Sequence, residues 1–180
     1  MVMILNFKHK IIREKSSPVV FPDNKLQSLI DDLSSLIDGR GKIGLAANQI
    51  GVLKRVGVIK INKEILDSQK KTNIDEENKD IYLVLINPEI ISLQDEYEVR
   101  EGCLSYPGIY ARIKRFKKCI IKNTKIDGTT ETIEAEHLLS QAIQHEMEHF
   151  DGKTFVDNFS KLEKILNENK IKKIKINKRG

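Results

Sequence analysis

The stretch QAIQHEMEHF, residues 141–150, has two histidines four positions apart, with a glutamate directly after the first. On a helix, His145 and His149 share one face and can bind a single metal ion, while Glu146 stays free to act as a general base. The alternative interpretation is that both histidines are hydrogen-bonded residues of the core. The i, i+4 spacing with an intervening glutamate makes this alternative less favoured. Because a catalytic metal site has three protein ligands and one open position, a third ligand has to come from elsewhere.

Candidates for this third ligand lie on both sides of the stretch. Downstream, Phe155 occupies the third-histidine position of the H-x-x-G-x-x-H extension found in some metalloproteases. The carboxylates that remain in this region are those of Asp157, Glu163 and Glu168. Upstream, EGCLSYPG (101–108) offers Cys103. Taken alone, such a residue is more often a buried structural cysteine than a ligand, and the Gly-Cys-Leu setting favours the ligand. A Cys-His-His set suits zinc, ferrous iron, nickel or cobalt, and the sequence itself does not select among them.

Helices that position these residues are predicted from the spacing of apolar side chains. Residues 26–37 have helical periodicity, with Asp23 available as the N-cap. Residues 137–150 form a second predicted helix, in which both histidines belong to the apolar face. A weaker helix is expected over 157–171, fraying into the lysine-rich end.

Strands and loops are expected between the helices. Pro88 should end the second predicted strand or place it at a sheet edge. A Gly-punctuated loop separates the first helix from the first strand, and a long polar loop separates the two strands. The expected segments are a loop at 38–51, strands at 54–61 and 81–90, a polar loop at 62–80, and a hairpin at 118–136 that turns at Asp127-Gly128.

This order of elements predicts an α+β fold. We expect mixed or antiparallel sheets packed around a central helix that bears the H-E-x-x-H motif, with an N-terminal helix and a helical, basic C-terminal tail. Residues 1–160 would form the catalytic domain and residues 161–180 the tail. The 180-residue chain carries a net charge of +5, and the last 20 residues hold eight basic side chains against two acidic ones. The body of the protein is therefore close to neutral.

The compartment is predicted from the cysteines and from the apolar runs. Two cysteines, Cys103 and Cys119, do not form a disulfide framework of the secreted type. No apolar run approaches the roughly 20 residues that span a bilayer, and no signal sequence is evident. We therefore expect a cytoplasmic protein without a membrane partner.

Three segments of the chain together resemble a known family. IGLAANQIG (43–51), EGCLS (101–105) and QHEMEHFDGKTF (144–155), in this order, are similar to the three signature motifs of peptide deformylase. The resemblance runs from about Ile4 to about Ser160. It implies a metal-dependent hydrolase that removes the formyl group from the N-terminal formylmethionine of nascent polypeptides and releases formate. It also favours a bacterial cytoplasm, with an organelle as the alternative.

The resemblance implies a role for each residue that matches a motif. Glu146 would be the general base and then the general acid. Gln49, which in isolation would be assigned as a loop-capping amide, would share the oxyanion with the metal and the Leu104 backbone N–H. One divalent metal per chain is implied, Fe²⁺ in the cell, with Zn²⁺, Ni²⁺ or Co²⁺ as substitutes. The implied metal ligands are Cys103, His145 and His149, and the implied cleft residues are Ile43, Gly44 and Gly102.

Five positions depart from the usual pattern of that family. Two of them concern the cleft, where Gln141 stands at an expected apolar wall of the methionine pocket and Tyr110 stands where an arginine often helps to bind substrate. These changes bear on substrate affinity more than on the type of reaction. The other departures are Lys42 for glycine, Asn48 for a frequent proline and Glu148 for aspartate.

Two other functions are compatible with parts of the sequence. A metallopeptidase that cleaves internal bonds would need a downstream ligand and an open cleft. A non-catalytic, metal-stabilised module that binds RNA would need a closed site with four ligands, and no fourth is evident. The basic tail is either a solvated terminus or a contact with ribosomal RNA near the exit tunnel. His9, His137 and Cys119 are assigned to structure or surface.

Overall fold

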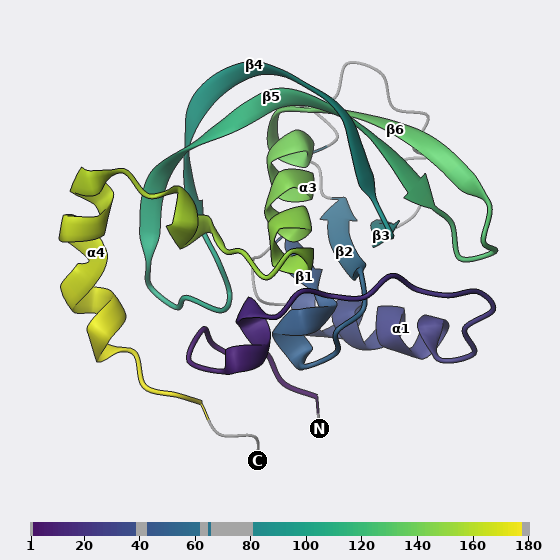
Figure 1. Cartoon of the computed structure of the whole chain (residues 1–180), viewed down its shortest axis with the longest axis horizontal. Coiled ribbons are helices and arrows are strands. Elements are labelled where there is room, and N and C mark those ends of the chain that lie inside the picture. Colours follow the sequence, from purple (N-terminus) through teal and green to yellow (C-terminus); the bar gives the residue numbers. More distant parts are fainter. Residues whose placement is uncertain (1, 39–42, 62–64, 66–80, 178–180) are drawn as a thin grey trace.

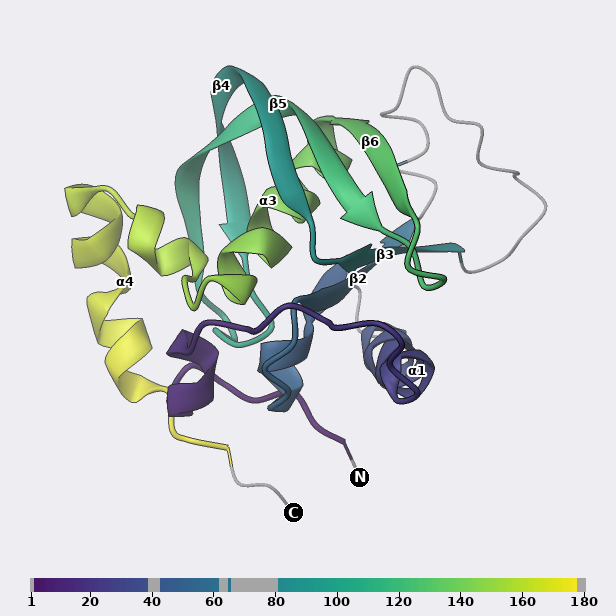
Figure 2. The same cartoon turned by 45° about the vertical axis from the view of Figure 1, so that its right-hand side comes forward.

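The protein forms two antiparallel sheets with a central helix packed between them (Figures 1 and 2). The structure is a computed structural model, and it describes residues 2–38, 43–61, 65 and 81–177. The long helix α3 contacts β5 and β6 of one sheet and β1 and β2 of the other. The helices are α1 (Leu26–Ile37), α3 (His137–Phe150) and α4 (Lys161–Lys173), with short 3₁₀ turns η1 (Lys10–Arg13), η2 (Ala47–Ile50) and η3 (Phe155–Asn158).

The strands are ordered β1-β2-β3 in one sheet and β4-β5-β6 in the other. The pairings between these strands are all antiparallel, and an isolated parallel bridge joins Ser17 to Lys54. The expected α+β class, with antiparallel sheets around the motif-bearing helix, is therefore confirmed. The strands are β1 (Gly44–Ala46), β2 (Val56–Ile61), β3 (Ile81–Ile86), β4 (Glu89–Gly102), β5 (Tyr110–Thr124) and β6 (Thr130–Glu136).

Helix α1 has the predicted bounds, but its predicted cap is wrong. The N-cap position belongs to Lys25, whose side chain makes no capping bond. The Asp23 carboxylate instead accepts the Lys25 backbone N–H at 3.0 Å and pairs with Lys54. The helix packs its apolar face against β1 and β2. Leu33 at its centre is fully buried.

Two segments differ from their predicted form. The expected loop at 38–51 contains strand β1 and the 3₁₀ turn η2, because GLA can add a short edge strand beside β2, with Gly44 opposite Ile59. The expected strand at 81–90 is two strands, separated at Asn87 and Pro88. Asn87 adopts a positive φ of 48°, and its side-chain amide bonds both backbone groups of Val19 at 2.8 and 2.9 Å. Of the two roles expected for Pro88, the structure shows the first: the strand ends just before it, at Ile86.

The long hairpin of β4 and β5 arches over α3 (Figure 1) and was not predicted for residues 91–117. Most β4 side chains are exposed, so the strand lacks the apolar alternation that would identify it. The hairpin predicted at 118–136 is present as the end of β5 and β6, with a turn in which Gly128 has a φ of +85°.

The C-terminal helix begins later than predicted, at Lys161, because Ser160 caps it by accepting the Glu163 backbone N–H at 3.2 Å. Beyond α4, the chain docks onto the N-terminal segment. Asn6 donates from its backbone to the Asn177 side chain at 2.9 Å, and Asn177 donates to the Ile4 carbonyl at 2.7 Å. The tail is therefore held as far as Asn177 rather than frayed.

Two expectations fall on residues that the structure does not describe. Lys42 lies outside the described residues, and so does the polar loop at 62–80 apart from Ile65, which is buried. Among the described helices, none is long and apolar enough to cross a membrane.

Candidate active site

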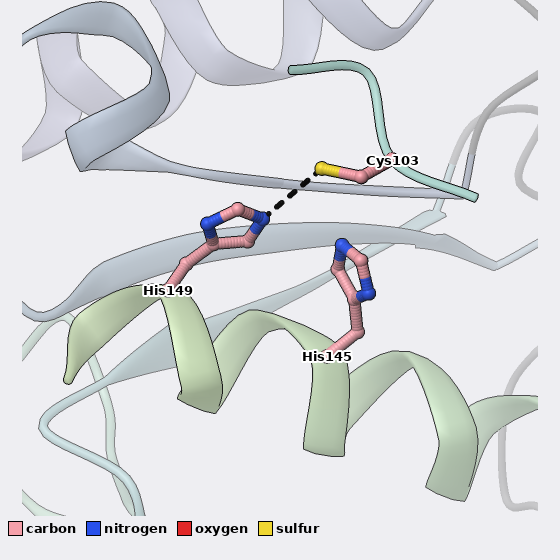
Figure 3. Close-up of side chains that lie close together, drawn as sticks. All are labelled: Cys103, His145 and His149. Atoms are coloured by element: carbon pink, nitrogen blue, oxygen red, sulfur yellow. Dashed lines mark hydrogen bonds between the residues drawn. The ribbon is translucent and has the colours of Figure 1, made fainter. Parts of the chain in front are cut away.

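Cys103, His145 and His149 converge on one point (Figure 3). Their ligand atoms all lie within 4.8 Å of one another, and all three side chains are buried. Cys103 Sγ is 3.3 Å from His149 Nε2. Among the described residues this is the one group of three histidine, cysteine or acidic side chains placed to hold a metal ion.

Local structure fixes these three side chains. The histidines are one helical turn apart on α3, so both point toward the same loop. That loop follows β4, and it turns directly after Cys103, where the Tyr106 N–H donates to the Cys103 carbonyl at 2.9 Å. The Tyr106 ring stacks on Phe7 with centroids 4.5 Å apart, which anchors the loop in the core. These contacts fix the loop that carries the thiol.

The downstream carboxylates are held elsewhere. Asp157 pairs with Arg13 at 2.5 Å, Glu163 accepts the Arg112 backbone N–H at 3.0 Å, and Glu168 pairs with Lys172 one turn along α4. Phe155, in the position of a protease's third histidine, is fully buried. The described part of the chain thus offers no downstream ligand for the metallopeptidase hypothesis.

The donor set fits a divalent metal ion. Metal–sulfur and metal–nitrogen bonds of about 2.3 and 2.0 Å place sulfur and nitrogen about 3.5 Å apart around a tetrahedral ion. The 3.3 Å between Cys103 Sγ and His149 Nε2 is close to this value. His145 Nδ1 lies 2.6 Å from Glu101 Oε1, which leaves its Nε2 for the shared point. Burial and the neighbouring His145 lower the pKa of His149 well below its usual value, which keeps it neutral as a ligand must be.

Glu146 lies beside this cluster and is 2% exposed. A Cβ atom at Gly44 would lie 2.3 Å from Glu146 Oε1, so the carboxyl needs the glycine to occupy this place. Burial raises the pKa of Glu146 to about 7, with Glu101 adding to the rise and His145 opposing it. Its Oε2 is buried and bonds to no described residue. A carboxyl of this kind can accept and release a proton near neutral pH.

A buried ion-pair network supports His145 from behind. The Arg115 guanidinium donates to both oxygens of Glu101 at 2.7 and 3.0 Å and to both oxygens of Glu148 at 2.5 and 2.9 Å. Burial alone would raise the pKa of Glu101, but His145 and Arg115 outweigh it and lower that pKa to about 2. The carboxylate is therefore ionised and can orient the His145 ring.

Neither Glu101 nor Arg115 was singled out in the sequence. Arg115 follows Ala111 and Ile113 on the buried side of β5. Arg115 could have been identified from the sequence, because it is a charged residue at a strand position that alternation predicts to be buried, and such a charge needs a buried partner. Glu148 belongs to the same network, so the glutamate that replaces an expected aspartate reaches Arg115.

Gln49 caps its own loop and also faces the cluster. Its Oε1 accepts the Ala46 N–H at 2.8 Å, which aims Nε2 at Cys103 Sγ, 3.4 Å away, and at Ser105 Oγ, 3.1 Å away. Ser105 Oγ in turn donates to the Leu5 carbonyl at 2.8 Å. The N-terminal segment and the cysteine loop thus hold the amide in one orientation.

A cavity of about 240 Å³ opens beside the cluster. Two of the residues that depart from the family pattern, Gln141 and Tyr110, lie at or near this cavity. Gln141 lines it and donates to Glu101 Oε2 at 3.2 Å. The Tyr110 ring packs against Gly102, where an added Cβ would come within 2.7 Å of the ring. Asn48 lies deeper and donates to the His149 carbonyl at 2.7 Å. His149 does not line the cavity, whereas every other residue expected at the site does. The lining residues with expected roles are Ile43, Gly44, Gln49, Gly102, Cys103, Leu104, His145 and Glu146.

The residues assigned to structure have no contact with the cluster. His9 Nε2 lies 2.7 Å from the Asn177 carbonyl, and Cys119 is buried in the core, where burial raises the pKa of its thiol. His137 begins α3 with a φ of +49°.

Known proteins resemble this chain over most of its length. The sequence profile of the family described as Polypeptide deformylase matches residues 1–165. A peptide deformylase of Bartonella tribocorum is 40% identical over 164 residues, which cover 91% of this chain and 86% of the relative. A crystal structure of a peptide deformylase from Legionella pneumophila, 35% identical, superposes with a TM-score of 0.80 over 96% of this chain and 94% of the other. A plant peptide deformylase structure, 26% identical, gives a TM-score of 0.82 over 95% and 87% of the two chains. The chain therefore belongs to the polypeptide deformylase family, a family of hydrolases.

Proposed function

We propose that this protein hydrolyses the formyl amide of N-formylmethionyl peptides and releases formate. The observation that carries this proposal is the convergence of Cys103, His145 and His149 beside Glu146 at an open cavity, in a chain of the deformylase family. The three ligands would hold one divalent metal. When bound, it would supply Lewis-acid activation of a water molecule and of the formyl carbonyl.

Glu146 would move the proton. Its carboxylate takes a proton from the attacking water and later delivers it to the leaving amine, as a general base and then a general acid. Burial has already raised its pKa to about 7, so neither transfer is strongly uphill near neutral pH. The close approach to Gly44 fixes the position of the carboxyl.

Gln49 and Leu104 would stabilise the negative charge that develops on the formyl oxygen. The Gln49 amide is oriented by Ala46 and Ser105, and the N–H that faces Cys103 Sγ at 3.4 Å is the one that would turn to the oxyanion. The Leu104 backbone N–H would be the second donor. Losing one such donor typically lowers the rate by about 10²- to 10³-fold. Ile43, Gly44 and Gly102 would hold the extended peptide along the cavity.

The deciding assay follows formate release from a short formyl-Met peptide. Protein purified without oxygen and loaded with Fe²⁺ or Ni²⁺ should release formate, and Glu146→Gln should lose activity while retaining metal. Glu134→Gln, the same change at an exposed site on β6, serves as the control and should remain active. An inactive metal-loaded protein contradicts the proposal, and so does full activity of the Glu146 variant. Cleavage of internal peptide bonds, detected by mass spectrometry, would favour a metallopeptidase instead.

Ferrous iron is the proposed native metal, on the basis of the family resemblance and of a thiolate ligand that iron accepts. Metal analysis of protein purified anaerobically should find about one iron per chain. Exposure to air should remove activity, and added Ni²⁺ should restore it unless Cys103 has been oxidised.

We further propose that residues 1–160 form the catalytic body and that the segment 161–180 contacts ribosomal RNA in a bacterial cytoplasm. The support is charge: the described lysines of this segment are all exposed. Replacing Lys170, Lys172 and Lys173 by Gln should weaken ribosome binding and lower its salt dependence. This test is sharper than a deletion, because deletion would also remove the contacts of Asn177 with Asn6. Unchanged binding by the triple variant contradicts the contact.

A further inference from the structure

Arg100 is the one exposed charged side chain among the described residues that line the cavity. Of the other ionisable groups that line it, Glu101 is buried and paired with Arg115 and His145, and Glu146 is buried beside Gly44. Arg100 is exposed, and it forms no ion pair with any carboxylate in the described parts of the chain. Its positive charge is therefore free to meet a charge on whatever enters.

The guanidinium is also held in place. Gly102 lies opposite Tyr110 in the β4–β5 ladder, and without a side chain there the Tyr110 ring packs onto the β4 backbone. The Arg100 guanidinium lies over this ring, 5.2 Å from its centroid. A cation fixed over an aromatic face loses less conformational freedom when it binds an anion.

Substrate chemistry favours a carboxylate as that anion. In a formylated peptide the terminal amine is an amide, so the substrate brings no positive charge near Arg100. With the formyl group at the cluster and the methionine side chain in the cavity, the residues that follow lie at the rim. A guanidinium binds a carboxylate in a two-pronged geometry that an amide matches less strongly.

We propose that Arg100, positioned by Tyr110, determines specificity and favours formyl-Met peptides that carry Asp or Glu directly after the methionine or one residue later. This inference rests on the proposed deformylase function. It assigns a preference among substrates of that reaction, and the reaction itself does not depend on it.

The test compares matched peptides. We expect formyl-Met-Glu-Ser or formyl-Met-Ser-Glu to be processed with a kcat/KM about three to ten times that of the Gln peptide, as for a partly exposed charge pair. The Lys peptide should be the poorest, and salt should reduce the difference. Arg100→Gln should bring the Glu-to-Gln ratio close to one. Tyr110→Leu should lower the ratio, and Tyr110→Phe, which keeps the aromatic face, should preserve it.

Arg112→Gln is the control, because Arg112 lies directly opposite Arg100 on β5 but does not line the cavity. If Arg112→Gln retains the Glu-to-Gln ratio, the preference comes from a local contact with Arg100. If Arg112→Gln loses the ratio as fully as Arg100→Gln does, the general positive field of the surface causes the preference and the inference is overturned. Equal processing of all peptides by the unaltered protein overturns this inference alone. If no formyl peptide is processed, the proposed function fails. The preference assigned to Arg100 is then tested by measuring the dissociation constants of the Glu and Gln peptides with the Glu146→Gln protein. Equal constants refute this preference.

Discussion

Replacing Glu146 by Gln should stabilise the metal-free protein while it abolishes catalysis. The carboxyl is buried beside Gly44, and burial raises its pKa from the ordinary 4.5 to about 7. Ionising it in the fold is therefore unfavourable, whereas the unfolded chain ionises it freely. This difference in pKa between the folded and unfolded states opposes folding by about 3 kcal/mol once the pH exceeds both pKa values. A neutral glutamine does not carry this penalty.

The direction of the pH dependence follows from proton binding. Between the two pKa values the folded protein binds the Glu146 proton and the unfolded chain does not, so this group makes stability fall as pH rises. The loss begins near 4.5, continues to about 7 and is complete above it. About 2.5 kcal/mol of the effect should develop between about pH 5 and pH 8. The gain from Glu146→Gln should therefore grow over this interval.

Urea unfolding of chelator-treated protein at about pH 5 and pH 8 measures this change. The comparison between pH values cancels any fixed effect of placing an amide at residue 146. Glu134→Gln on the surface of β6 should show no growth in stability with pH. A gain for Glu146→Gln that stays constant across the pH interval would refute the assignment of a raised pKa to this carboxyl.

Three further predictions concern the supports of the site. Glu101→Gln should weaken metal binding by about 10- to 100-fold, measured by competition with a chromophoric chelator, because the amide orients the His145 ring less firmly; unchanged affinity would deny Glu101 this role. Arg115→Met should lower the free energy of unfolding by about 3–5 kcal/mol, since it leaves the buried Glu101 carboxylate without its cation; urea unfolding checks this, and a loss below about 1 kcal/mol would contradict it. Asn177→Ala should destabilise the protein by about 1–3 kcal/mol, seen by the same method, because the Asn6 N–H loses its acceptor; a neutral substitution would show that the tail is not held there.

Local sequence predicted the helices and missed much of the sheet that covers them. The α1 and α3 bounds followed from apolar spacing, since each helix buries one face or more against the sheets. Most side chains of strand β4 are exposed, so its position depends on pairing with β5, a contact that periodicity does not report. The break at Asn87 depends in the same way on the distant backbone of Val19. These features are set by partners remote in the sequence.

The sequence alone determined the chemistry available: His145, Glu146 and His149 on one helix, and a cysteine in a glycine-flanked segment. It could not place the thiol, because the contact between Cys103 and His149 closes a gap of 46 residues. Tertiary structure also decided which charges are paired. It holds Arg115 between two carboxylates in the core and leaves Arg100 open at the cavity. Ligand types are a local property of the chain, whereas burial, pKa and charge pairing arise only where distant segments meet.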